Sequence, residues 1–150
     1  QKGHKNIALM IGEKNDFCVS WWRYKGYVKA LEENDISFNH ENLIIGDYDS
    51  KIAYEVTLDF LKKRKDITAI FAISDVMAMG VAKAVTDSGL TVGKEISIVG
   101  FDGMNISRYY NPGITTIKQP MEEMAIKSVE ILFNILKNKF EVKTWAVFLE

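Results

Sequence analysis

The sequence predicts an α/β domain in which a parallel sheet carries helices on both faces. Short apolar runs without polar alternation recur along the chain, and such runs are typical of strands buried on both faces. Between them lie longer segments whose apolar residues recur at helical spacing. This alternation predicts a parallel sheet, because parallel neighbours are joined by crossover helices.

The clearest unit lies near the middle of the chain, where two apolar runs flank one helical segment. Residues 69–73 and 96–99 are predicted to be buried strands. Ser74 or Asp75 is placed to cap a helix over residues 76–87. The unit is one βαβ motif, for which a right-handed crossover is expected.

The other elements extend this pattern and then depart from it near the end. In chain order they are a strand at 6–11, a helix at 20–33 that Ser20 can cap, a strand at 42–45, a helix at 50–65, a strand at 114–118, a helix at 121–139 and a strand at 144–149. Gly26 is expected to let the first helix approach the sheet closely. Trp21 and Trp22 point in different directions on that helix, so one is expected in the core. The helix at 121–139 is apolar most of the way round, which predicts burial on more than one side.

Composition limits the classes of protein to which the chain can belong. Its 150 residues are 47% hydrophobic and 26% charged, which is typical of one ordered globular domain. A net charge of -1 provides no field for phosphate binding, so this segment is not expected to bind nucleic acid itself. Cys18 is the only cysteine, which fits a reducing compartment. No apolar run is long enough to span a bilayer, and no signal peptide is visible.

The sequence offers little support for catalysis. His4 and His40 lie away from the predicted ligand edge, and no spacing predicts a metal site. Glycine-rich phosphate-binding motifs are missing from the sequence, so no nucleotide cofactor is expected. Asp75 and Asp102 could form a hydrolytic carboxylate pair, but a helix cap and a ligand contact are simpler interpretations.

A neutral polyhydroxylated ligand fits the predicted edge better. The carboxyl ends of parallel strands meet at one edge of an open sheet, and ligands bind there. Sugars require planar polar groups that chelate adjacent hydroxyls, and aromatic faces that pack on the ring. The candidates at this edge are Arg23, Tyr48, Asp75, Phe101, Asp102 and either Trp21 or Trp22. A surface ion pair is the alternative for Arg23, a helix cap for Asp75 and a cover for the sheet edge for Tyr48.

Three stretches resemble the effector-binding domain of the lac/gal repressor family. They are RYKGYVKALEENDI, SDVMAMGVAKAVTDSGLTVGKEISIVGFDG and ITTIKQP, in the family's order and spacing across nearly the whole chain. The resemblance implies the type I periplasmic-binding-protein fold, in which two subdomains close on a small molecule. It also implies that another subdomain and a helix-turn-helix headpiece precede this segment, which agrees with a first residue, Gln1, that is not an initiator methionine.

The resemblance divides the chain into four parts. Residues 1–109 correspond to the C-terminal subdomain, 110–120 to the crossover and hinge, 121–140 to a helix of the other subdomain, and 141–150 to a returning strand. Gln119 and Pro120 match the hinge. Because the sheet that normally covers the helix at 121–140 is absent here, we expect this helix to pack on a neighbouring chain or in a position unlike the family's.

The resemblance also assigns roles to single residues. Arg23 occupies the position of the family's effector-contacting arginine, and Asp102 that of its ligand-chelating aspartate. Tyr48 falls where the family often has an aromatic residue against the ligand. Ser74 replaces a frequent asparagine and Gly103 a common second aspartate, so the chain departs from the family pattern there. The full expected ligand set is Arg23, Tyr48, Ser74, Asp75, Phe101, Asp102 and Trp22.

A regulator that works as a homodimer is the function that the resemblance implies. Met79, Ala82 and Tyr110 fall at positions of the family's subunit interface, with core packing as the alternative for Met79 and Ala82. The expected protein is a cytoplasmic transcriptional repressor and not an enzyme. Its small effector is expected to be a sugar, and it is expected to bind operator DNA only through the headpiece. The first alternative is a solute-binding protein of a sugar transporter, which the upstream sequence would distinguish. The second is a small α/β hydrolase.

Overall fold

The computed structural model describes residues 3–13 and 19–137 of the chain. The chain forms two compact units, residues 1–118 and residues 119–150, and each is described by itself. The first unit contains the sheet and the helices that cover it. Across the described residues, no helix combines the length and the apolar character that crossing a membrane requires.

The first unit is built on a five-stranded sheet in the order β2-β1-β3-β4-β5, and every neighbouring pair is parallel. The strands are β1 (Ile7–Ile11), β2 (Leu43–Ile45), β3 (Ala69–Ala72), β4 (Ser97–Asp102) and β5 (Thr115–Lys118). The predicted parallel sheet is confirmed. β5 lies beyond residue 109, where the first subdomain was expected to end, but its pairing with β4 makes it part of this unit.

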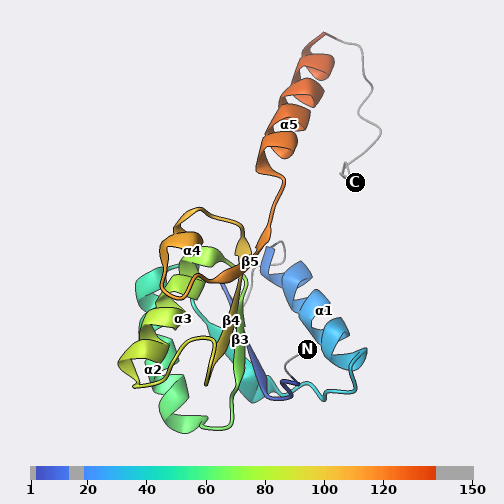
Figure 1. The fold of residues 1–150 in the computed structure, drawn as a ribbon. Coiled ribbons are helices and arrows are strands. Elements are labelled where there is room, and N and C mark those ends of the chain that lie inside the picture. The colour runs from blue at the N-terminus through green and yellow to red at the C-terminus, as the bar shows by residue number, and fades with distance from the viewer. Residues whose placement is uncertain (1–2, 14–18, 138–150) are drawn as a thin grey trace. The chain divides into compact units, whose positions relative to one another are not determined.

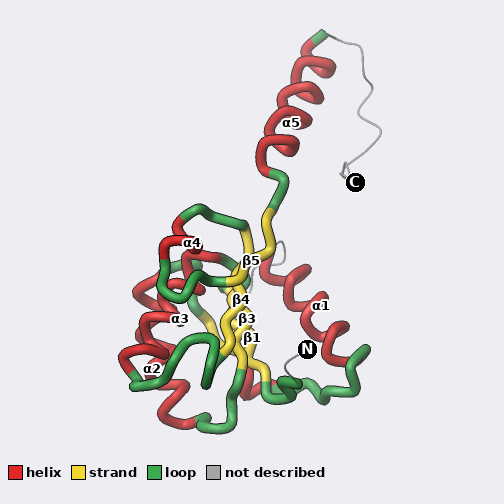
Figure 2. The backbone as a smooth tube through the Cα atoms, in the orientation of Figure 1, coloured by secondary structure: helices red, strands yellow, loops and turns green. Residues whose placement is uncertain are grey.

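Helices cover both faces of this sheet, as predicted. Helix α1 (Val19–Glu32) lies on one face, and α2 (Ser50–Lys63) and α3 (Asp75–Asp87) lie on the other (Figures 1 and 2). The strand order explains the arrangement, because the chain passes from β1 to β2 in one direction and then back past β1 to β3 and β4. Right-handed crossovers in opposite directions place their helices on opposite faces. The short helices η1 (His40–Asn42) and α4 (Ile106–Tyr109) complete the unit.

The core is densest between the sheet and the pair α2 and α3. Ile70, Ala72 and Ile98 are buried on this face, whereas Phe71 and Val99 alternate to the α1 face and are only half-buried. On α3, the buried side chains include Met77, Ala78, Val81, Ala82, Ala84 and Val85. The two helices approach closely at Gly80, where an added Cβ would lie 2.1 Å from the backbone oxygen of Ser50.

Helix α1 presents a narrower buried stripe than its neighbours. Tyr27 and Leu31 are buried, and the Tyr27 hydroxyl donates a hydrogen bond to the Ile7 carbonyl at 2.8 Å. Two expectations about this helix are wrong. Gly26 is exposed and no atom lies within 4 Å of a Cβ added there, so it serves no close approach to the sheet. Trp21 and Trp22 are both exposed, so neither belongs to the core.

The Tyr27 hydroxyl makes the stability of this unit depend on pH in the alkaline range. Burial, followed by the effect of Tyr24, raises the pKa of Tyr27 from 10.0 to about 12. The folded state therefore holds this proton more tightly than the unfolded chain does. Its contribution to stability is complete below the unfolded pKa of 10.0 and is lost as the pH rises towards about 12.

We expect Tyr27→Phe to lower the free energy of unfolding by about 1 kcal/mol at neutral pH, because one buried hydrogen bond is lost. The difference between wild type and variant should narrow as the pH rises from about 10 to about 12, which urea denaturation at each pH would measure. Tyr109→Phe is the control, because Tyr109 is 84% exposed. A wild-type advantage that stays constant across this range would contradict the assignment.

The second unit contains helix α5 (Met121–Leu136), which begins directly after Pro120. It agrees with the predicted helix as far as the described residues reach, and the strand predicted at residues 144–149 lies outside them. Its apolar side chains are exposed all round the helix; they include Met121, Met124, Ile126, Val129, Ile131, Leu132, Phe133, Ile135 and Leu136. The expectation that a partner surface covers this helix stays a prediction.

Candidate functional site

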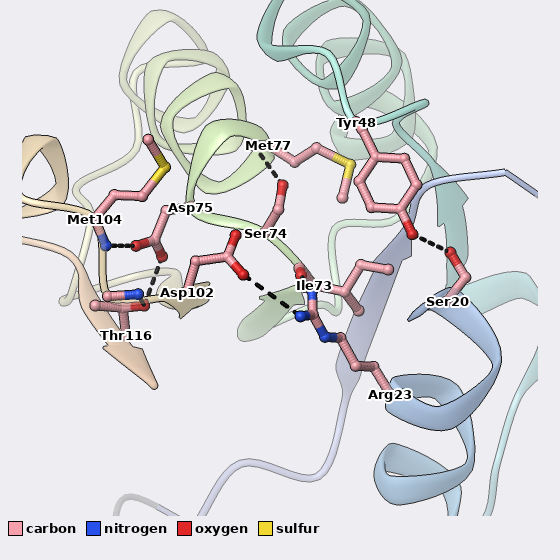
Figure 3. Close-up of polar contacts among 11 residues, drawn as sticks. Ser20, Arg23, Tyr48, Ile73, Ser74, Asp75, Met77, Asp102, Met104 and Thr116 are labelled. Atoms are coloured by element: carbon pink, nitrogen blue, oxygen red, sulfur yellow. Dashed lines mark hydrogen bonds and ion pairs between the residues drawn. The ribbon is translucent and has the colours of Figure 1, made fainter. Parts of the chain in front are cut away.

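The candidate site lies at the carboxyl edge of the sheet, at the point where the strand order reverses. From β1 the chain turns towards β2, whereas from the neighbouring β3 it turns towards β4. The connections after β1 and β3 therefore diverge, and open α/β sheets bind ligands at such a switch point. Residues of α1, the β2–α2 loop, the end of β3 and the end of β4 meet there (Figure 3).

Arg23 is the centre of this site. Its guanidinium donates to the Ile73 carbonyl and lies 3.4 Å from Asp102 Oδ1. The guanidinium carbon also lies 3.9 Å from the centre of the Phe101 ring. The side chains of Arg23 and Asp102 keep 16% and 19% of their surface exposed, so the pair is largely buried but still reaches the solvent. These contacts hold a planar donor and a carboxylate acceptor side by side, which is the arrangement that adjacent hydroxyl groups require.

Asp102 has an unusual backbone conformation for a residue with a side chain. Its φ is 121°, in the region that favours glycine, and Gly103 follows with a φ of 75°. Phe101 and Asp102 belong to β4, which continues past the predicted end at residue 99 because they pair with Ile117 and Lys118 of β5. Conformations of this kind persist where the surrounding structure holds them, and they concentrate at functional sites.

Tyr48 follows β2 at the same edge of the sheet and is held by α1. Its hydroxyl lies 3.0 Å from Ser20 Oγ, which also accepts a hydrogen bond from the Gly12 amide. The ring packs against Gly12, where an added Cβ would lie 1.9 Å from a ring carbon. Both Asp47 and Tyr48 have a positive φ, near 50°. Sequence reasoning expected Ser20 to cap a helix and missed its contact with Tyr48, because a bond between residues 28 apart leaves no local pattern.

Ser74 caps α3, as one of the two predicted candidates, and Asp75 has another role. Ser74 is the cap of α3, since its hydroxyl accepts from the Met77 amide, and Asp75 is the first residue of the helix. Asp75 is fully buried, and its two carboxylate oxygens accept from Thr116 and from the Met104 amide. It therefore offers no surface to a ligand in this structure, and its expected role as a ligand contact stays a prediction that this burial does not favour. Thr116, its partner, was not singled out from the sequence.

The remaining expected site residues occupy varied positions. Trp22 is 70% exposed on α1. Met79 and Tyr110 are partly exposed where they pack against the core, whereas Ala82 is fully buried, which agrees with its alternative role in core packing. Gln119 and Pro120 begin the second unit.

The histidines lie elsewhere, in agreement with the sequence analysis. His4 bonds to the hydroxyls of Thr68 and Ser97, at the amino ends of β3 and β4, and His40 belongs to η1. Among the described residues, no three histidine, cysteine or acidic side chains gather as metal ligands would.

Comparison with known proteins identifies the family. The profile of the periplasmic binding protein-like domain matches residues 1–145. The chain belongs to this family. The HTH-type transcriptional regulator MalR of Clostridium butyricum is 58% identical over 133 residues, which are 89% of this chain and 40% of MalR. The HTH-type transcriptional repressor PurR of Actinobacillus pleuropneumoniae is 34% identical over 137 residues, which are 91% of this chain and 40% of PurR.

Solved structures agree with these relatives. The Lac repressor dimer bound to operator and the anti-inducer ONPF superposes with a TM-score of 0.82 at 33% identity, over 91% of this chain and 46% of that one. The resemblance to the effector-binding domain of the lac/gal repressor family is thereby confirmed. The chain spans about 40% of the length of the curated relatives that it matches.

Proposed function

We propose that this chain is the effector-sensing part of a lac/gal-type transcriptional regulator and that it binds a sugar at the carboxyl edge of its sheet. The observation that carries the proposal is the arrangement of Arg23, Asp102 and Phe101 at the switch point. Arg23 and Asp102 provide charged groups that can chelate the neighbouring hydroxyl groups of a sugar. The exposed Tyr48 provides an aromatic face at the same edge of the sheet.

Binding at this edge would act on DNA by shifting a conformational equilibrium. A ligand favours one state of a protein only to the extent that it binds that state more tightly. A sugar held by Arg23 and Asp102 on one side and by the other subdomain on the opposite side favours the closed arrangement. That difference in affinity is linked to the fit of the headpieces to operator DNA, and the linkage is reciprocal. The protein in this proposal works in the cytoplasm, and its DNA contacts lie in the headpiece.

The alternatives have less support. A solute-binding protein of a transporter shares the fold, but the relatives that match this chain are named as regulators. A hydrolase that uses Asp75 and Asp102 would require two accessible carboxylates, and Asp75 is fully buried with both oxygens bonded within the chain. A regulator is therefore the function that the site and the relatives support together.

A thermal-shift screen of the full-length regulator tests the choice of ligand. Glucose, maltose, cellobiose, sucrose and lactose would be compared with purine bases and amino acids at the same concentrations. We expect at least one sugar to raise the melting temperature, because a ligand that binds only the folded state stabilises it. Stabilisation by a purine or an amino acid, with no response to any sugar, would contradict the proposal.

The proposal includes a homodimer whose interface contains Met79 and Tyr110. Both are partly exposed on the surface of α3 and of the segment after α4, and the Tyr110 hydroxyl lies 3.3 Å from Thr86 Oγ1 on α3. We expect Met79→Asp to weaken the dimer at least about tenfold, because burying an unpaired charge is costly. Sedimentation velocity over a range of concentrations measures the effect.

Lys29→Asp is the control for the dimer, since the Lys29 side chain on α1 is 76% exposed and the variant likewise introduces an aspartate on a helix. It should leave the dimer unchanged. If Met79→Asp sediments like wild type at every concentration, this part of α3 is not the interface.

A further inference from the structure

We propose that Asp75 and Thr116 are positioning residues that hold Asp102 in the orientation required for effector binding. The inference rests on the proposed function, which makes Asp102 a ligand group. Asp75 belongs to α3 and is fully buried, and Thr116 belongs to β5 and is half-buried. In this proposal they act through the backbone that follows Asp102. Figure 3 shows Asp102 between Arg23 on one side and this pair on the other.

The pair forms a short relay of hydrogen bonds. Thr116 Oγ1 donates to Asp75 Oδ1 at 2.6 Å and accepts from the Gly103 amide at 3.2 Å. The Met104 amide donates to Asp75 Oδ2 at 2.6 Å. Because an ionised carboxylate can only accept, the Thr116 hydroxyl must donate to it, which directs the Thr116 lone pairs towards Gly103. Both amides that follow Asp102 are therefore tied to one buried carboxylate.

The chain makes space for this carboxylate at Gly100. Asp75 is 0% exposed, and a Cβ added at Gly100 would lie 2.2 Å from Asp75 Oδ1. As the first residue of α3, Asp75 also lies at the end of the helix dipole that favours negative charge. A buried charge is costly unless it is bonded on all sides. The relay supplies a hydrogen bond to each carboxylate oxygen, and Gly100 leaves room for them.

The backbone conformation of Asp102 explains why the residues that follow it need to be held by hydrogen bonds. Asp102 has a φ of 121° and Gly103 a φ of 75°, and a residue with a Cβ avoids the first of these values. The pairing of β4 with β5 restrains the residues up to Asp102, and the relay restrains Gly103 and Met104 immediately after it. Without the relay, the strained peptide can relax, and the carboxylate of Asp102 moves relative to Arg23.

Thr116→Val tests the relay, because valine has nearly the shape of threonine but no hydroxyl. Thr116→Ser restores the hydroxyl and serves as the rescue. Thr57→Val is the matched control, since Thr57 is also fully buried but its hydroxyl has no hydrogen-bond partner in the structure. All three variants would be made in the full-length regulator and compared with wild type.

The first measurement is hydrogen exchange without any ligand, on peptides that cover residues 101–106 and with resolution at Gly103. We expect the Gly103 amide to exchange about tenfold faster in Thr116→Val, because it loses its acceptor, and at the wild-type rate in Thr116→Ser and Thr57→Val. Unchanged exchange at Gly103 in Thr116→Val would overturn the inference, whether or not sugars bind.

The second measurement is calorimetric titration of the same variants with glucose, maltose and cellobiose. For a sugar that binds wild type, we expect the Kd to rise about tenfold in Thr116→Val and to stay within about twofold in Thr116→Ser and Thr57→Val. A merely structural role would lower the melting temperature and leave the Kd unchanged, and that result would overturn the inference. If wild type binds none of the three sugars, the proposed function is contradicted for them, and the exchange experiment still decides whether the relay holds this loop.

Discussion

Replacing Gly80 with alanine is expected to lower the free energy of unfolding by about 3 kcal/mol, at the upper end of the range for overpacked sites. The added Cβ would lie 2.1 Å from the Ser50 carbonyl oxygen, 2.9 Å from Ala53 Cβ and 3.0 Å from the Tyr54 amide nitrogen. Two of these three atoms belong to the backbone of α2, so no side chain can rotate away. The helices must separate, and the packing of α3 on α2 is then lost along their length.

A second helical glycine in the same chain is the matched control. Gly26 lies within α1, is exposed, and has no atom within 4 Å of an added Cβ. Gly26→Ala is therefore expected to raise the free energy of unfolding by about 0.5–1 kcal/mol, through helix propensity alone. Denaturant titration of the two variants and wild type measures both effects. Equal stability of the Gly80 and Gly26 variants would contradict the close approach of α2 and α3.

The change of Arg23 to lysine is expected to raise the Kd for the sugar about thirtyfold, which corresponds to about 2 kcal/mol. Lysine keeps the positive charge but lacks the planar fork of donors. The guanidinium donates to the Ile73 carbonyl, lies beside Asp102 and stacks on Phe101, and a single ammonium group cannot make these contacts together. The loss should appear in affinity more than in stability, because the pair remains partly exposed to solvent.

Lys25→Arg, the reverse substitution on the same helix, is the control for Arg23→Lys. Lys25 is exposed and lies over the rings of Trp21 and Trp22, so Lys25→Arg keeps both its charge and its aromatic neighbours. Calorimetry on the full-length regulator should show a wild-type Kd for Lys25→Arg. If Arg23→Lys also binds like wild type, Arg23 does not contact the effector.

The sheet could be predicted from the sequence because its signals are local. Apolar runs such as residues 69–73 form the strands, with Ile70 and Ala72 buried on one face and Phe71 half-buried on the other, and the helices between them carry an apolar stripe. The family resemblance then placed Arg23 and Asp102 at one edge, and the structure brings them within 3.4 Å of each other. Arg23 and Asp102 lie close together because of the order of the strands, which the crossover rules constrain strongly.

The misses come from contacts between distant parts of the chain. Ser74 and Asp75 are both acceptable caps by composition. Only the bonds from Met104 and Thr116, which are 29 and 41 residues later, show that Asp75 has another role. A glycine in mid-helix has the same local cost whether it faces solvent or a neighbouring helix, so Gly26 and Gly80 could not be distinguished by propensity. The position of α1 on the sheet decides which of its residues are buried, and it leaves both Trp21 and Trp22 exposed.

The central claim is that a sugar bound at Asp102 controls the affinity for operator DNA, and fluorescence anisotropy of labelled operator with the full-length regulator tests it most directly. We expect a sugar that stabilises wild type to change its operator Kd at least about tenfold, within the usual range of allosteric coupling. Asp102→Asn should bind operator like wild type without sugar and lose the response. Asp35→Asn, at a remote aspartate that also has a positive φ of 55°, should keep it. An operator Kd that responds equally to the sugar in wild type and in Asp102→Asn would contradict the claim.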